Sequence, residues 1–149
     1  MASPPELDLV ANLYRTTNAV VRELDRRLVQ DHEVTFIQAV TLIAIGSFDR
    51  PQPRLVADFL SQQSQTVTGV LDRLERAGHV QRVRDLDDRR AVRLELTESG
   101  DRLVRTLNDR LRNHVADLIG GVRDSIRTRL QGDLETLESS VKSATTPSA

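Results

Sequence analysis

The sequence predicts a mainly α protein with a small β-hairpin: a winged helix-turn-helix domain plus N- and C-terminal dimerisation helices. Three observations support this fold class. Apolar residues recur at helical spacing along most of the chain, and two of the helices so indicated are joined by a very short turn. The spacing then changes to two in two short stretches directly behind these helices, which predicts a hairpin, or wing.

The composition is that of a folded protein. The 149 residues are the length of one domain, with 38% hydrophobic and 29% charged residues. The absence of Cys excludes disulfides, thiolate metal sites and cysteine nucleophiles. We see neither a signal peptide pattern nor an apolar run long enough to span a bilayer, so we expect a cytoplasmic protein. The net charge of −1 does not exclude nucleic acid as a partner, because binding depends on where the charges lie.

Two capping patterns predict the first two helices. Ser3, followed by Pro4 and by Glu6, predicts the start of a long helix that ends near Asp31. Its apolar stripe consists of Val10, Leu13, Val20, Val21, Leu24 and Leu28. Thr35 and Gln38 form a capping box for a second helix that runs to about Phe48. Residues 40–45 are apolar almost all round, so this helix should be central and buried.

The helix-turn-helix follows a proline-containing loop at residues 49–53. A helix of about two turns carries Leu55, Val56, Phe59 and Leu60. After a turn at residues 61–63, a helix at residues 64–77 should bury Val67, Val70, Leu71 and Leu74 and stop at Gly78. Alternation at residues 80–84 and 92–96 predicts the hairpin strands, with a charged loop at residues 85–90.

The C-terminal part is helical again. Thr97 should cap a helix that ends at the break Gly120-Gly121 and carries the stripe Leu103, Leu107, Leu111, Val115 and Leu118. The last helix carries Val122, Ile126, Leu130, Leu134, Leu137 and Val141, and we expect residues 143–149 to be a frayed tail. Residues 1–149 are thus predicted to be one domain, with its DNA-binding core at about 34–97 and dimerisation helices at about 4–31 and 98–142.

The amphipathic helices at both ends have more apolar surface than a centre of about 60 residues can cover. An intertwined homodimer would satisfy their stripes. The alternative is a monomeric helical bundle.

The segment from residue 66 to residue 100 resembles the MarR family of winged-helix regulators. The resemblance rests on residues 66–80, Arg82-Val83-Arg84-Asp85, Asp88-Arg89-Arg90 and Leu94-Glu95-Leu96-Thr97-Glu98-Ser99-Gly100. The Asp-Arg-Arg wing followed by Leu-x-Leu-Thr-x-x-Gly is its most specific part. The resemblance implies a homodimer that binds palindromic DNA and usually releases it on meeting a small ligand.

The start of the second helix of the helix-turn-helix predicts base-edge contacts, because a recognition helix enters the major groove with its N-terminal residues. The candidates are uncharged polar residues: Gln63, Ser64, Gln65, Thr66 and Thr68. Relatives often have Gly where Ser61 stands and Ser or Asp where Gln63 stands. Since Gln is a poor N-cap, either the cap moves to Ser64 or the loop is looser than usual.

The wing concentrates positive charge. Residues 73–93 hold seven Arg against four acids, although the whole chain is nearly neutral. The resemblance implies that Arg90 enters the minor groove, with Asp88 holding its guanidinium. Arg73, Arg84 and Arg89 are candidate phosphate contacts. The alternative is a solvated turn in which the acids neutralise these Arg side chains.

Other sites are less clearly marked. By resemblance, a pocket for a small aromatic or phenolic ligand would involve Tyr14, Arg15, His32, Thr35 and Phe36, although these can also be ordinary helix-junction residues. His32, His79 and His114 show no metal-binding spacing, and no catalytic motif is evident, so we expect no enzyme, metal or cofactor.

The sequence therefore predicts a sequence-specific DNA-binding transcriptional regulator. The resemblance implies a repressor, the most frequent role in this family, which a small molecule releases from DNA. Its expected partners are a pseudo-palindromic double-stranded operator and a second copy of the chain, and no membrane. The alternative is a winged-helix protein–protein interaction module that no longer reads DNA.

Overall fold

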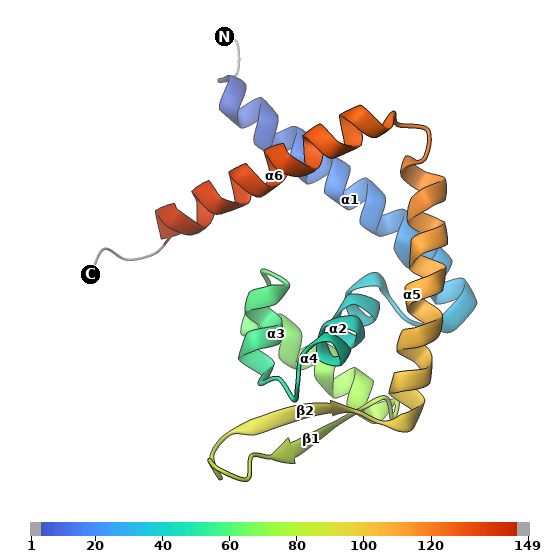
Figure 1. Ribbon diagram of the computed structural model, residues 1–149, viewed down its shortest axis with the longest axis vertical. Helices are drawn as coiled ribbons and strands as arrows, with labels where there is room; N and C mark the ends of the chain where they lie inside the picture. The colour runs from blue at the N-terminus through green and yellow to red at the C-terminus, as the bar shows by residue number, and fades with distance from the viewer. Residues whose placement is uncertain (1–3, 146–149) are drawn as a thin grey trace. The chain divides into compact units, whose positions relative to one another are not determined.

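The computed structural model describes residues 4–145 (Figure 1). The elements are α1 (Pro5–His32), α2 (Phe36–Ser47), α3 (Pro53–Phe59), α4 (Ser64–Arg76), β1 (Val80–Arg84), β2 (Val92–Leu96), α5 (Glu98–Ile119) and α6 (Asp124–Thr145). The chain forms two compact units, Met1–His114 and Val115–Ala149, which are described separately below. The predicted order of helices and the hairpin is confirmed.

The start of α1 differs from the prediction, and the start of α2 confirms it. The predicted cap Ser3 lies outside the described residues; Pro4 stands at the N-cap position of α1 without a side-chain cap bond. In α2, the backbone N–H of Gln38 donates to Thr35 Oγ1 (3.3 Å). The backbone N–H of Thr35 donates to Gln38 Oε1 (2.8 Å), which completes the capping box. Asp25 on α1 accepts the Phe36 N–H (2.6 Å) and so joins the two helices.

The core of the first unit surrounds α2, as its apolar sequence predicts. Helix α2 packs against α1, α3, α4 and β2 and buries five side chains: Ala39, Thr41, Leu42, Ala44 and Ile45. Thr41 is tolerated there because its hydroxyl donates to the Ile37 carbonyl (2.6 Å). Helix α4 adds Val67, Val70, Leu71 and Leu74, all buried as predicted.

The turn between α3 and α4 excludes one of the two alternatives for the helix start. Gln63 occupies the N-cap position with an extended backbone but makes no side-chain cap bond, and Ser64 is the first helical residue. The cap therefore does not move to Ser64. Ser61 adopts a left-handed backbone (φ 51°), the conformation that favours the Gly found in many relatives. At the other end, Gly78 is left-handed (φ 81°) and stops the helix as predicted.

The two strands pair antiparallel, from Val80 with Leu96 to Arg84 with Val92. On its other side, β2 is anchored to the loop before α3, because the Leu94 N–H donates to the carbonyl of buried Pro51 (2.9 Å). Helix α4 contacts β1 directly. The hairpin is thus fixed to the helix-turn-helix along its base.

The C-terminal helices depart from the prediction at two points. Val122 lies in the turn before α6 rather than in the helix. Residues 143–145 are helical rather than frayed, and the remainder of the predicted tail lies outside the described residues. Helix propensity at Ala144 and the bond from Ser143 Oγ to the Ser139 carbonyl (2.9 Å) are consistent with this extension. No helix in the described part of the chain is both long and apolar enough to cross a membrane.

Candidate nucleic-acid interface

Helix α4 presents an uncharged polar surface at its N-terminal end. Gln63, Ser64, Gln65, Thr66 and Thr68 are all exposed, as the sequence predicts for residues that meet base edges. The opposite side of the helix is buried in the core, which fixes the orientation of this surface. Because no side chain caps α4, its first-turn N–H groups remain available to a phosphate at the positive end of the helix dipole.

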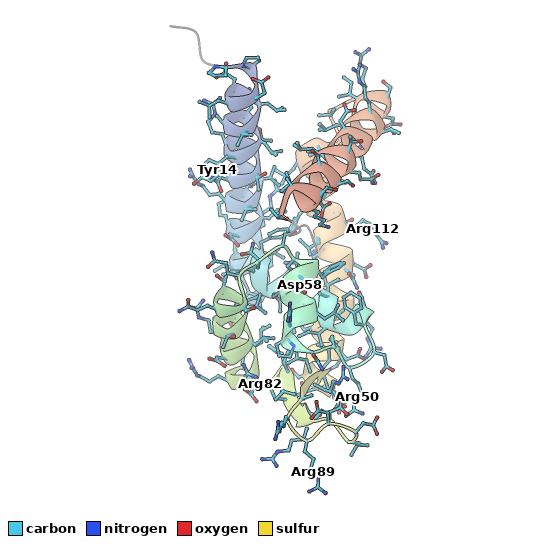
Figure 2. The ribbon with its side chains drawn as sticks, turned by 90° about the vertical axis from the view of Figure 1, so that its left-hand side faces the viewer. Tyr14, Arg50, Asp58, Arg82, Arg89 and Arg112 are labelled. Atoms are coloured by element: carbon cyan, nitrogen blue, oxygen red, sulfur yellow. The ribbon has the colours of Figure 1, made fainter. Side chains whose placement is uncertain are left out.

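Arg82 joins the hairpin to α4. Its guanidinium donates to Asp72 Oδ1 (2.7 Å) and to Glu75 Oε2, both carboxylates being on α4. Figure 2 shows Arg82 beside the lower end of this helix. Arg82 therefore holds the wing against α4, and its charge is neutralised by these two carboxylates.

Asp85 organises the loop of the hairpin. Its Oδ1 accepts the backbone N–H groups of Asp87 (2.8 Å) and Asp88 (3.4 Å), and its Oδ2 accepts Arg93 Nε (2.5 Å). The backbone N–H of Asp87 and the Arg93 guanidinium hold the pKa of the Asp85 carboxyl below its usual value. The carboxylate is thus ionised at neutral pH and keeps the loop in one conformation.

The loop is also tied to the body of the domain. Besides Asp85, Arg93 reaches the carbonyl of Arg50 (3.4 Å), and the Arg50 side chain pairs with Glu95 on β2 (2.7 Å). The wing is therefore connected to the rest of the domain by these ion pairs and this hydrogen bond.

The tip corrects one expectation. Asp88 Oδ1 accepts the backbone N–H of Arg90 (3.0 Å), and no bond from the Arg90 guanidinium to Asp88 is found among the described residues. The Asp at this position fixes the main chain of the turn, so it orients Arg90 through the backbone. Arg89 lies at the far end of the hairpin in Figure 2.

The seven Arg side chains of residues 73–93, on α4 and the wing, separate into two groups. Arg82 and Arg93 are neutralised by acids, as the solvated-turn alternative supposed. The others make no ion pair within 4.0 Å among residues 4–145 and are exposed; they are Arg73, Arg76, Arg84, Arg89 and Arg90. Asp72, Glu75 and Asp85 thus pair with the two structural Arg side chains, whereas Asp87 and Asp88 form no ion pair among the described residues. The Arg side chains predicted to contact DNA remain available.

Sequence reasoning missed the roles of Asp72, Glu75 and Asp85. For Asp85 a signal was present, because an Asp that opens a turn commonly accepts the N–H two residues later. For Asp72 and Glu75 there was none, because their partner Arg82 lies on another element.

Comparison with known proteins places this domain in a family. The MarR family model matches residues 32–91. The regulator TtmR of Methylorubrum extorquens is 33% identical over 85% of this chain and 65% of its own length. SarZ of Staphylococcus haemolyticus is 30% identical over 64% of each chain. The crystal structure of Streptococcus pneumoniae FabT in complex with DNA is similar at TM-score 0.73 and 25% identity, covering 93% of this chain and 99% of that one. Residues 32–91, which run from α2 into the hairpin, thus match the MarR family.

The chain spans slightly less than two thirds of the length of these two curated MarR-type relatives. Both are described as HTH-type transcriptional regulators, which is a binding function rather than an enzymatic one.

The ligand residues predicted from the MarR resemblance lie in two places. His32, Thr35 and Phe36 are at the junction of α1 and α2, where Thr35 caps α2. Tyr14 and Arg15 are exposed further up α1, roughly 27 Å from His32 at 1.5 Å per residue. Figure 2 shows Tyr14 far up this helix. One protomer therefore does not gather the five residues, and the ligand set stays a prediction.

The three histidines also differ in setting. His79 Nδ1 lies 2.9 Å from Ser99 Oγ at the base of the hairpin. The Nε2 atoms of His32 and His114 are buried without a hydrogen-bond partner, and His114 Nε2 is 3.6 Å from Asp31 Oδ2. Within residues 4–145, no three His, Asp or Glu side chains are arranged to hold a metal ion.

Proposed function

We propose that the chain is a homodimeric transcriptional regulator that binds a pseudo-palindromic DNA operator through α4 and the wing. The observation that carries the proposal is the division of charge described above. Acids neutralise the Arg side chains that hold the wing to the domain, whereas Arg84, Arg89 and Arg90 extend from it without ion partners among the described residues. The DNA complex of the similar FabT structure supports the same use of this fold.

Each part of this surface suits a different part of the duplex. The Gln, Ser and Thr side chains at the start of α4 can donate to and accept from base edges in the major groove. The tip Arg side chains suit the negative potential of a narrow minor groove, and Arg73 and Arg84 suit phosphates. Two copies related by a two-fold axis would place their recognition helices roughly 34 Å apart, which is one turn of DNA.

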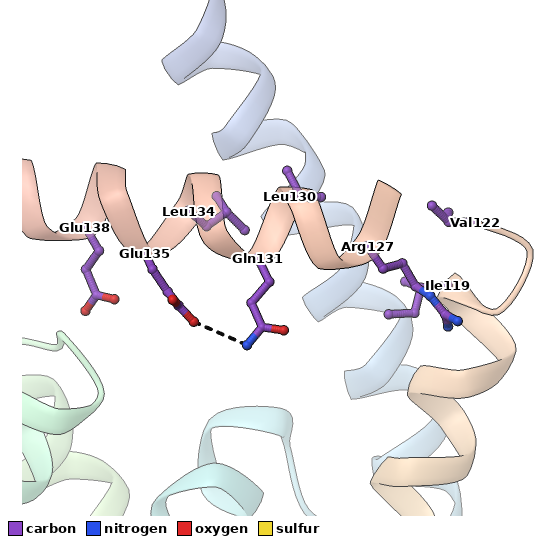
Figure 3. Close-up of a pocket in the computed structure, with 8 residues that line it drawn as sticks. All are labelled: Ile119, Val122, Arg127, Leu130, Gln131, Leu134, Glu135 and Glu138. Carbon is purple, nitrogen blue, oxygen red and sulfur yellow. Dashed lines mark hydrogen bonds between the residues drawn. The ribbon is translucent and has the colours of Figure 1, made fainter. Parts of the chain in front are cut away.

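The proposed dimer would cover apolar side chains that the terminal helices leave exposed. Helix α1 exposes Leu7, Leu9, Val10 and Tyr14, and α6 buries none of its side chains. A hollow of about 390 Å³ on the second unit is lined by Ile119, Val122, Arg127, Leu130, Gln131, Leu134, Glu135 and Glu138 (Figure 3). Exposed apolar side chains that recur along one stripe of a helix are typical of a surface that packs against another chain, so a second copy would cover them.

We further propose that the regulator is a repressor released by a small aromatic or phenolic ligand. By resemblance, such a ligand would bind between the dimerisation helices and the winged domain. The buried, unpartnered His32 Nε2 is a polar atom at the α1–α2 junction that such a ligand could meet. With Tyr14 and Arg15 so distant in one protomer, a complete pocket would need the second copy.

Selection from random duplex DNA tests the DNA-binding proposal. We expect the purified protein to enrich a palindrome whose half-sites lie one helical turn apart. Affinity for that palindrome should fall steeply as salt is raised, because several phosphate contacts release counterions. If no sequence is enriched at modest salt, the chain is instead the protein–protein interaction module.

A further inference from the structure

Gly69 lies inside the recognition helix, on the surface that faces away from the core. It follows Gln65 by four residues and therefore shares its side of α4. The buried residues Val67, Val70 and Leu71 point the other way. Asp72, three residues beyond Gly69, is paired with Arg82 (2.7 Å), so its charge on this side of α4 is neutralised.

The protomer itself does not need a glycine at this position. A Cβ added to Gly69 would meet no atom within 4 Å outside the backbone of its own helical turn, and its φ is not left-handed. Other glycines of the same unit are different: Gly78 has a φ of 81°, and a Cβ on Gly100 would clash with the His79 carbonyl. Glycine inside a helix also lowers helix stability relative to Ala. Gly69 thus weakens α4 without serving its packing.

We propose that Gly69 is a positioning residue for DNA recognition. Because it has no side chain, the backbone of α4 can lie close to the base edges. The inference rests on the proposed function, because the space it explains is used only when DNA is bound. Glycine is the residue that allows another molecule to approach a backbone closely.

The neighbours of Gly69 show what this close approach would serve. Gln65 is an amide that can pair bidentately with adenine only when its helix lies deep in the groove. The Thr68 hydroxyl is already donated to the Ser64 carbonyl (2.9 Å), which leaves its methyl group for apolar contact, for instance with a thymine methyl. A side chain at position 69 would lift both of these residues away from the bases.

Substitution at position 69 moves stability and DNA binding in opposite directions. We expect Gly69→Ala to raise Tm by about 2–4 °C, since Ala is the better helix former and nothing obstructs it. Affinity for the operator selected by the wild-type protein should fall about tenfold, the effect of losing one base-edge interaction. The larger Gly69→Leu should abolish specific binding while the protein stays folded. Thermal melts and titrations of labelled duplex DNA measure the two quantities.

Gly132→Ala is the matched control. Gly132 is also inside a helix with open space around its Cβ, but on the polar side of α6. It should raise Tm similarly and leave DNA affinity unchanged. Wild-type affinity in both position-69 variants, or a lower Tm in Gly69→Ala, would overturn the inference alone. A wild-type protein that selects no DNA sequence would instead overturn the proposed function, and this inference with it.

Discussion

At the scale of single residues, Gly100 shows how tightly the hairpin base packs on α5. A Cβ at position 100 would lie 2.0 Å from the His79 carbonyl oxygen. Thr97 holds the same two segments together: its hydroxyl donates to the Gly78 carbonyl (2.6 Å) and accepts the Gly100 N–H (3.1 Å). The Thr-x-x-Gly part of the motif is therefore a structural joint between the hairpin and α5, and not a DNA contact.

Gly100→Ala should destabilise the fold by about 3 kcal/mol, because the added methyl must displace backbone rather than a flexible side chain. Urea unfolding followed by circular dichroism measures the change. Gly132→Ala serves as the control, since its Cβ meets no neighbour within 4 Å. A loss of unfolding free energy below about 0.5 kcal/mol, the range of ordinary surface substitutions, would show that the backbone around His79 can move to accommodate the methyl group.

Residue roles were predictable where the partners are close in sequence. The Thr35–Gln38 capping box and the stop at Gly78 depend on neighbouring atoms and were predicted correctly. The reason for Gly100 was not predictable from the sequence. The carbonyl that excludes a side chain there belongs to His79, which directly precedes the other strand of the hairpin. The motif alone indicated the family but not the contact.

At the scale of elements, Arg82 joins α4 and the hairpin. The alternating pattern predicted both strands, and their register confirms it. It could not show that Arg82 reaches Asp72 and Glu75, because that depends on how the strand crosses the helix. As a result, the sequence did not reveal that Arg82 and Arg93 are structural.

Arg90→Ala should therefore affect DNA binding, whereas Arg82→Ala should affect the stability of the fold. Arg90→Ala should weaken operator binding and reduce the slope of log affinity against log salt by about 1. Its stability should stay within about 0.5 kcal/mol of wild type. Arg82→Ala should cost about 1 kcal/mol of unfolding free energy, because two carboxylates of α4 lose their partner.

Salt titrations of DNA binding and urea unfolding of both variants provide the comparison. Unfolding of Arg90→Ala, or its failure to form the same oligomer as the wild type, would make Arg90 structural instead.

At the scale of the whole molecule, the terminal helices carry the proposed dimer interface. Their amphipathic stripes were predictable because helical spacing is a local property. Ile126, Leu130, Leu134 and Val141 indeed remain exposed on α6. The spacing of apolar residues does not show which surface packs against them, so the partner has to be inferred. The dimer is therefore a proposal that depends on exposed apolar area rather than on a contact.

Leu134→Asp tests that proposal. A carboxylate in the centre of an apolar interface would be buried without a partner, which costs several kcal/mol, about 3 or more. We expect sedimentation to show a shift from dimer to monomer, together with a loss of operator binding, because one winged domain then meets only one half-site. Thr128→Asp adds the same charge to the opposite side of α6 and should leave the dimer intact. Dimers of unchanged affinity in Leu134→Asp would show that this stripe is not the interface, and a monomeric wild-type protein would favour the helical bundle.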